Sequence, residues 1–215
     1  MHTATTDYRL SGWRGEFVQP SIEQAFRRHS EADAARSLRR ALLVWASLLL
    51  LFGLMDYSAL GGGYDFFLLF GWRVATAAVL LLLYWQSRRK PSLVSDGYAV
   101  TAAEVFGSVL FFMLYFLRHD MVSWVIAVVA ISLLALFMFI PNRVYLSLLA
   151  AAFLSIGMVA CVAARGMGAD KVIGLGFILA LPTAVGFFTA LRWQFAQRQQ
   201  YALLMQVISS NRDLQ

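Results

Sequence analysis

The most informative pattern in this sequence is a series of six apolar blocks separated by short polar connectors. Each block is about 20 residues long, which is the length that an α-helix needs to cross a hydrocarbon layer of about 30 Å. Because the connectors are short, consecutive helices should be antiparallel neighbours. The pattern therefore predicts an all-α integral membrane bundle with spans at Ala41–Leu60, Phe66–Trp85, Tyr98–Leu117, Met121–Ile140, Val144–Ala164 and Val172–Leu191.

The composition agrees with membrane insertion. Hydrophobic residues make up 60% of the chain and charged residues 14%, whereas about a quarter of a soluble domain is charged. The formal net charge of +6 comes mostly from arginines beside the apolar blocks, where topology explains them better than nucleic-acid binding. We therefore expect a lipid bilayer as the surrounding partner and no nucleic acid.

The basic residues also predict the orientation of the bundle, because they are enriched in cytoplasmic loops. One end of the predicted bundle carries only Arg118, Arg165 and Lys171. The opposite end carries Arg27, Arg28, Arg36, Arg39, Arg40, Arg88, Arg89, Lys90, Arg143, Arg192 and Arg198. That second end should be cytoplasmic, with both chain termini on the same side.

Polar segments flank the apolar blocks and divide the chain into three predicted parts. Residues 1–40 form a tail and an amphipathic cytoplasmic helix, for which Ser21 and Gln24 are spaced as a capping box. This helix either lies along the membrane surface or runs straight into the first span. Residues 41–191 form the membrane domain, and residues 192–215 form a cytoplasmic coiled-coil helix.

The coiled-coil prediction depends on spacing. Tyr201, Leu204 and Ile208 recur three and four residues apart in a stretch without glycine or proline. The helical pattern is still running at Gln215, so we expect a missing effector domain to follow. Pro182, inside the sixth span, should kink the helix that leads to the coiled coil, and these four residues are the predicted signal relay.

Small residues recur every fourth position in two spans, which favours close helix packing. We expect contacts inside the bundle, with a dimer contact as the alternative. The residues are Ala99, Ala103 and Gly107 in the third span and Gly176, Ala180 and Ala184 in the sixth.

Three ionisable residues lie inside the predicted spans, where charge is costly and often functional. Counted from the cytoplasmic ends, Asp56 lies at about 22 Å, Arg73 at about 18 Å and Glu104 at about 9 Å. Asp56 and Arg73 are therefore the expected pair. Either they form a structural ion pair, or Arg73 binds the head of a small amphipathic ligand.

Two further residues carry open alternatives. Glu104 is either a protonated acid bonded to a neighbouring helix or a ligand or proton site. His119, between Arg118 and Asp120, belongs either to a polar turn or to a pH-sensitive outer lip, because histidine titrates near neutral pH. Neither the separated histidines nor the single cysteine, Cys161, suggests a metal site or a disulfide.

Several short motifs resemble the six-helix sensor region that precedes the catalytic domain of bacterial membrane diguanylate cyclases, the GGDEF-domain proteins. They are Pro20, Glu23 and Phe26 before a basic cluster, the run Phe52, Gly53, Leu54 and Asp56, an arginine in the second span, and Ile140–Arg143 between the fourth and fifth spans. The closing Asn211, Arg212, Asp213 and Leu214 are similar to the signalling helix upstream of such domains.

The resemblance implies a homodimeric receptor in the bacterial inner membrane that adjusts the pairing of cytoplasmic cyclic di-GMP synthases. GTP and Mg²⁺ are implied only for that effector domain, and no cofactor for these residues. The membrane regions of some adenylate cyclases and histidine kinases are also similar. A small stand-alone transporter, with Asp56, Arg73 and Glu104 as its substrate or relay site, is the alternative from another class.

Overall fold

The computed structural model describes residues 8–12, 15–90, 92, 96–118 and 122–213. Within these ranges the chain is helical and contains six helices long and apolar enough to cross a membrane. They are α1 (Pro20–Leu60), α2 (Tyr64–Arg89), α4 (Tyr98–Leu117), α5 (Val122–Phe139), α6 (Val144–Ala164) and α7 (Ala169–Asp213). Each of the six predicted spans corresponds to one of these helices.

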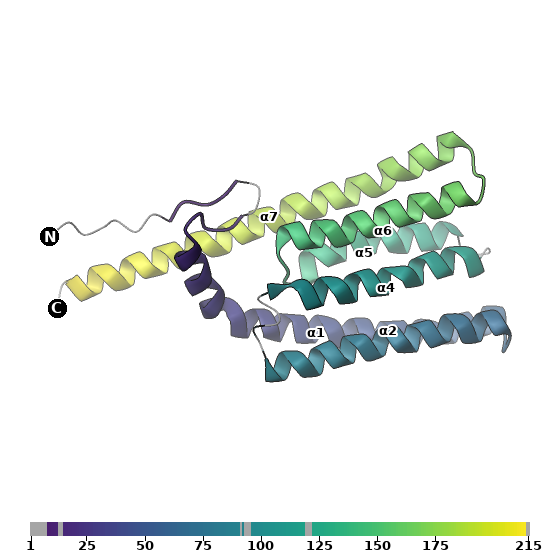
Figure 1. The fold of residues 1–215 in the computed structure, drawn as a ribbon, viewed down its shortest axis with the longest axis horizontal. Helices are drawn as coiled ribbons and strands as arrows, with labels where there is room; N and C mark the ends of the chain where they lie inside the picture. The colour runs from purple at the N-terminus through teal and green to yellow at the C-terminus, as the bar shows by residue number, and fades with distance from the viewer. Residues whose placement is uncertain (1–7, 13–14, 91, 93–95, 119–121, 214–215) are drawn as a thin grey trace.

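Two of the helices are much longer than a bilayer requires. α1 has 41 residues and α7 has 45, so their lengths are about 60 and 68 Å. The additional turns of both helices leave the bundle at the same end (Figure 1), and the first turns of α1 tilt toward α7. The cytoplasmic helix predicted before the first span is therefore continuous with it.

The start of α1 differs from the predicted capping box. The helix begins at Pro20, its N-cap is Gln19, and no side chain caps it. Proline suits the first helical position because its missing N–H would have no partner there and its φ angle is already helical. The helix thus starts two residues earlier than a capping box with Ser21 as its N-cap predicts.

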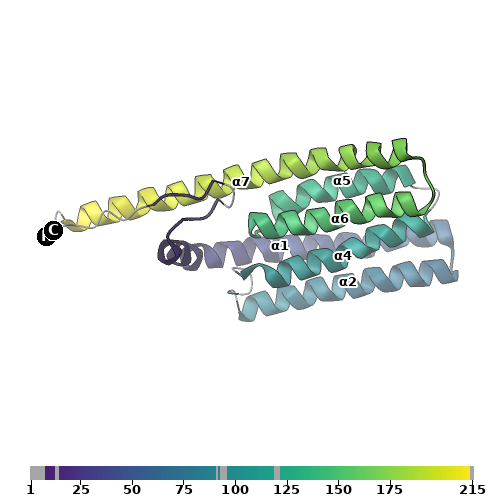
Figure 2. The same cartoon turned by 45° about the horizontal axis from the view of Figure 1, so that its top comes forward.

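The bundle has two packed halves that meet at α4. α1 packs on α2, α2 on α4, and α4 on α6, while α5 and α6 both pack on α7. In Figure 2, α7 runs along the upper edge of the bundle and α2 along the lower edge. The larger apolar core joins α4 to α7 around the fully buried side chains of Tyr115, Leu133, Leu154, Met158 and Leu179.

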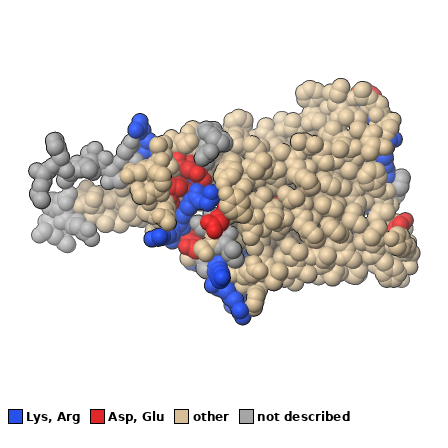
Figure 3. All heavy atoms as spheres, viewed as in Figure 1, with Lys and Arg blue, Asp and Glu red and all other residues tan. Residues whose placement is uncertain are grey.

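The outer surface of the bundle is apolar over its whole length. Phe177, Leu181 and Ile156 expose 74%, 68% and 68% of their surface, which would be unfavourable for helices facing water. In Figure 3 the charged residues gather at the ends of the bundle, most of them where α1 and α7 leave it. These six candidate spans and their apolar outer faces indicate a multi-pass membrane protein.

The two predicted stripes of small residues have different environments. On α4, Ala103 is buried, and a Cβ on Gly107 would lie 3.5 Å from Cγ2 of Thr76 on α2. The α4 stripe therefore packs inside the bundle as predicted. On α7, Ala180 and Ala184 are exposed, and a Cβ on Gly176 would meet no heavy atom within 4 Å.

The prediction of internal packing is thus wrong for the α7 stripe. The close approach on this helix occurs at Gly186 instead, where a Cβ would lie 2.5 Å from Cδ2 of Phe137 on α5. Glycine is required at this point because two helices approach across a single aromatic ring. Pro182 is buried in the same helix, and α7 continues through it without a break.

Candidate functional site

Asp56, Arg73 and Arg118 form a buried ionic group, here called the Asp56 cluster. Nε of Arg73 donates to Oδ2 of Asp56 at 2.6 Å, and Nη1 of Arg118 donates to Oδ1 at 2.8 Å. The three residues expose 3%, 5% and 4% of their surface. The predicted pairing of Asp56 with Arg73 is therefore confirmed, and the cluster joins α1, α2 and the end of α4.

The surroundings of Arg73 resemble those of a structural ion pair more than those of a ligand site. Its Nη1 also donates to the carbonyl oxygen of Leu49 at 3.5 Å, and its guanidinium lies 6.0 Å from the ring centre of Phe52. The guanidinium is thus directed at groups of α1.

Arg118 is the member of this cluster that the sequence pattern did not identify. It was interpreted as part of a polar turn, because it directly follows the last apolar residue of the third span. A long side chain at the end of a helix can extend back along the bundle, so chain position alone does not show its depth. His119, the neighbouring site prediction, lies outside the described residues.

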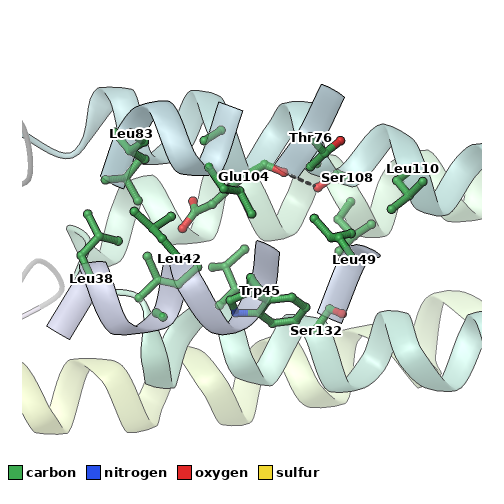
Figure 4. A pocket seen from close by; sticks show the side chains of 18 of the residues that line it. Leu38, Leu42, Trp45, Leu49, Thr76, Leu83, Glu104, Ser108, Leu110 and Ser132 are labelled. Carbon is green, nitrogen blue, oxygen red and sulfur yellow. Dashed lines mark hydrogen bonds between the residues drawn. The ribbon is translucent and has the colours of Figure 1, made fainter. Parts of the chain in front are cut away.

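Glu104 lies apart from the Asp56 cluster, beside a partly open cavity of about 110 Å³ between the two halves of the bundle. Its Oε2 accepts a long hydrogen bond of 3.4 Å from Nδ2 of Asn142. Among the described residues, its Oε1 has no hydrogen-bond partner although it is buried. Figure 4 shows the carboxyl directed toward Leu42 and Leu83.

The lining of this cavity, here called the Glu104 cavity, comes from five helices. α1, α2 and α4 supply most of it, and α5 and α6 close it. The lining residues are Leu38, Ala41, Leu42, Trp45, Leu49, Thr76, Leu80, Leu83, Val100, Ala103, Glu104, Gly107, Ser108, Leu110, Phe111, Ser132, Leu136, Ile140 and Leu154. Most of these side chains are apolar, and Glu104 is the one carboxyl among the described residues that line the cavity.

Asn142, in the connector between α5 and α6, links the Glu104 cavity to α7. Its Nδ2 also donates to Oγ1 of Thr101 at 2.8 Å, and its Oδ1 accepts from the backbone N–H of Arg143 at 2.8 Å. Its carbonyl oxygen accepts a hydrogen bond of 3.0 Å from Nε2 of Gln194 on α7. Two hydrogen bonds, through Asn142, therefore connect Glu104 with Gln194 on α7.

A second buried ionic group lies where α1 and α7 leave the bundle. Nη2 of Arg198 donates to Oε1 of Glu23 at 2.8 Å, and Nε donates to Oε2 at 3.0 Å. Oε2 also accepts the backbone N–H of Phe17 at 3.0 Å, and Oε1 accepts Nε of Arg27 at 2.8 Å. Arg27 continues to Glu16 at 2.7 Å.

This group, the Glu23 clamp (Glu16, Phe17, Glu23, Arg27 and Arg198), ties the start of α1 to the extension of α7. Burial raises the pKa of the Glu23 carboxyl, but the hydrogen bonds and charge of Arg198, with Phe17 N–H and Arg27, outweigh burial, so the pKa lies below its ordinary value. Glu23 precedes the apolar part of α1. A carboxylate that is fully paired in this way remains ionised at neutral pH.

Aromatic rings cover the Glu23 clamp. Phe17, Phe26 and Tyr201 form a small apolar core, and the ring centres of Phe26 and Tyr201 are 5.4 Å apart. The guanidinium of Arg198 lies 4.6 Å from the ring centre of Phe26, close enough for a cation–π contact. Low access of water strengthens the ionic contacts beneath these rings.

The structure separates the residues that were predicted to form the coiled coil. Tyr201 is buried against the N-terminal segment of the same chain, while Leu204 and Ile208 expose 43% and 49% of their surface. Of these three residues, Leu204 and Ile208 are therefore available to a partner helix, together with the neighbouring exposed residues Leu203 and Val207.

The Glu23 clamp was not found from the sequence as a site, although Glu23 and Phe26 belong to the motifs that carried the resemblance. The two ends of its central ion pair are 175 residues apart, and no local periodicity connects them. Within the described part of the chain, no group of three His, Cys, Asp or Glu side chains is placed to hold a metal ion.

The chain was compared with known protein families, with curated proteins and with solved structures, and none of them matches it.

Proposed function

We propose that this chain is the transmembrane sensor and regulatory module of a bacterial signalling enzyme, most directly a diguanylate cyclase that makes cyclic di-GMP. In this proposal both termini face the cytoplasm, and α7 carries the signal from the inner membrane to an effector domain. The supporting observation is the Glu23 clamp, which holds α7 at the point where it leaves the bundle.

A sensor needs an element with two arrangements and a ligand that favours one of them. α7 suits that role because it packs on α5 and α6 inside the bundle and continues as one helix beyond it. Sliding or rotating α7 would break the contacts of Arg198 with Glu23, whereas the α1–α2 packing would be left intact. The clamp therefore defines one state of α7, and its release defines the other.

The proposed output is the pairing of two α7 extensions. Leu204 and Ile208 are four residues apart on the exposed side of the helix, a spacing that a parallel coiled coil uses for its seam. In the homodimer, a shift of α7 would change how two effector domains meet. GTP and Mg²⁺ would bind to those domains and not to the residues described here.

The first test is to read the gene beyond the codon for Gln215. A GGDEF-type motif within about 100 residues, the size of a small domain, is the result we expect. A stop codon soon after Gln215 would remove the effector and overturn the proposal.

A functional test uses a chimaera in which residues 1–215 precede the catalytic domain of a dimeric diguanylate cyclase, with cyclic di-GMP as the readout. Glu23→Gln should change the output because it unpairs Arg198, which is buried. Asp33→Asn is the matched control, since its side chain on the same helix is 80% exposed. Equal output from the wild type and both variants would contradict the role of the clamp.

Transport is the alternative that a separate measurement distinguishes. Purified chain in proteoliposomes should support no substrate flux above that of empty liposomes. Flux that Arg73→Ala or Glu104→Ala abolishes would replace the sensor proposal with a transporter.

A further inference from the structure

The Glu104 cavity contains two polar atoms without a partner. Oε1 of Glu104 on α4 and Oγ of Ser132 on α5 are buried, and neither has a hydrogen-bond partner among the described residues. Both residues line the same cavity. Buried polar atoms nearly always have a partner, so two such atoms at one cavity make it a candidate binding site for a small molecule.

The size and lining of the cavity limit what that molecule is. The Glu104 cavity has about 110 Å³ and is partly open, so it is somewhat smaller than a closed apolar cavity of roughly 150 Å³ that binds benzene, and a ligand larger than the enclosed space can extend through the open side. Among the described residues that line it, Glu104 alone is ionisable, and no lysine, arginine or histidine is present. The lining therefore has no cation to pair with an anionic ligand, and its unpartnered carboxyl oxygen accepts a donor.

From this geometry we propose that the Glu104 cavity binds a compact apolar molecule with a single N–H or O–H donor, such as a small aromatic amine or alcohol, which donates to Oε1 of Glu104. An apolar body fills the space among Leu38, Leu42 and Leu83, while the donor satisfies the carboxyl.

Occupancy of the cavity has a direct route to α7. The ligand and Asn142 share one carboxyl group, because Oε2 of Glu104 accepts from Nδ2 of Asn142. The carbonyl of Asn142 accepts from Gln194, and Oε1 of Gln194 accepts from Nη1 of Arg198 at 3.3 Å. This part of the inference rests on the proposed function, whereas binding to the cavity does not.

Binding is tested with the full chain in lipid nanodiscs by ¹⁹F NMR of 4-fluorobenzyl alcohol, with 4-fluorotoluene as the probe that lacks a donor and 4-fluorobenzoate as the anion. Empty nanodiscs correct for partition into lipid. We expect saturable binding of the alcohol, about tenfold tighter than that of 4-fluorotoluene because a buried acceptor gains its partner, and no saturable binding of the benzoate.

Two variants on different helices test the site. Glu104→Met should remove the preference for the alcohol and leave binding of 4-fluorotoluene within about twofold, because the cavity stays open while the acceptor is lost. Ser132→Leu should fill the cavity and abolish binding of both probes. Alcohol binding that equals 4-fluorotoluene binding in the wild type, or that both variants leave unchanged, overturns the proposal.

A separate readout distinguishes this inference from the proposed function. Spin labels at Gln24 and Leu203, both exposed, report the distance between α1 and the α7 extension in a Cys161→Ser background. A change of distance on adding 4-fluorobenzyl alcohol supports both the cavity and the relay. Saturable binding without a change of distance supports the cavity and overturns the relay, and absence of binding overturns the cavity alone.

Discussion

Glu23 on α1 and Arg198 on α7 are 175 residues apart in the chain, yet the carboxylate accepts two hydrogen bonds from the guanidinium. An arginine and a carboxylate often form two parallel hydrogen bonds. This bidentate geometry fixes the orientation of the two helices that carry them. The contact lies outside the apolar part of either helix. It joins the first and last helices of the bundle at the end where both leave it (Figure 1).

The stability of the Glu23 clamp should decrease as the pH falls into the acid range. The pKa of Glu23 is lowered from its ordinary value of 4.5, so the carboxylate contributes stability that is fully present above that value. This contribution is lost as the pH falls through the lower pKa of the folded state. The distance between spin labels at Gln24 and Leu203 should therefore stay constant from neutral pH to about pH 5 and increase only in stronger acid.

Glu23→Gln should release the clamp at neutral pH and remove this acid transition. Breaking one partner of a buried pair costs about 3 kcal/mol, which is enough to favour the open arrangement. Asp33→Asn should leave the transition where it is in the wild type. A transition at the same pH in the Glu23→Gln protein would show that another group controls it.

Disruption of the Asp56 cluster should destabilise the bundle itself, because the cluster joins α1, α2 and the end of α4. Asp56→Asn leaves the guanidiniums of Arg73 and Arg118 buried beside a neutral amide, and we expect a loss of about 3 kcal/mol in unfolding free energy. Denaturation by SDS in mixed micelles, followed by circular dichroism, measures the change. Asp65→Asn, at an exposed position in the first turn of α2, is the control and should be nearly neutral.

A single methyl group added at the contact between α5 and α7 should destabilise the bundle. A Cβ on Gly186 would lie 2.5 Å from Cδ2 and 3.2 Å from Cβ of Phe137, so the base of the side chain would have to move as well as the ring. We expect Gly186→Ala to destabilise the bundle by about 1–3 kcal/mol, the cost of overpacking. Phe137→Ala in the same protein should relieve most of the added strain.

Gly174→Ala is the matched control on the same helix. No heavy atom lies within 4 Å of a Cβ at this position, and alanine favours a helix over glycine by about 1 kcal/mol. The two substitutions should therefore change the unfolding free energy in opposite directions. If Gly186→Ala were as stable as Gly174→Ala, the two helices would be farther apart than the structure shows.

The six helices could be predicted from the sequence because bilayer thickness sets the length of each apolar block independently of the others. Block length identified each of the six, and similar depth on adjacent helices was enough to pair Asp56 with Arg73. Such arguments use only local position and neighbouring helices. They could not identify Arg118, whose side chain returns into the bundle from the end of α4.

The polar contacts between residues far apart in the chain could not be predicted from the sequence. Glu23 and Arg198 lie in polar segments where most charged residues face water, so neither differs from its neighbours in type or spacing. Asn142 belonged to a motif, but its bond to Gln194 depends on how α7 packs on the α5–α6 connector. Tyr201 matched a coiled-coil seam by spacing, and the structure places it against Phe26 instead.

The exposed part of the α7 extension should mediate dimerisation if the proposed output is correct. Leu204→Asn with Ile208→Asn replaces two exposed apolar side chains by polar ones at the predicted seam, and should weaken self-association of the full chain by at least about tenfold. Fluorescence energy transfer between labelled chains in nanodiscs, at several dilutions in lipid, measures that affinity. Ser209→Asn, an exposed change on the same extension, should leave the affinity unchanged. Equal affinity in all three proteins would place any dimer contact elsewhere, with the exposed stripe of Ala180 and Ala184 on α7 as the next surface to test.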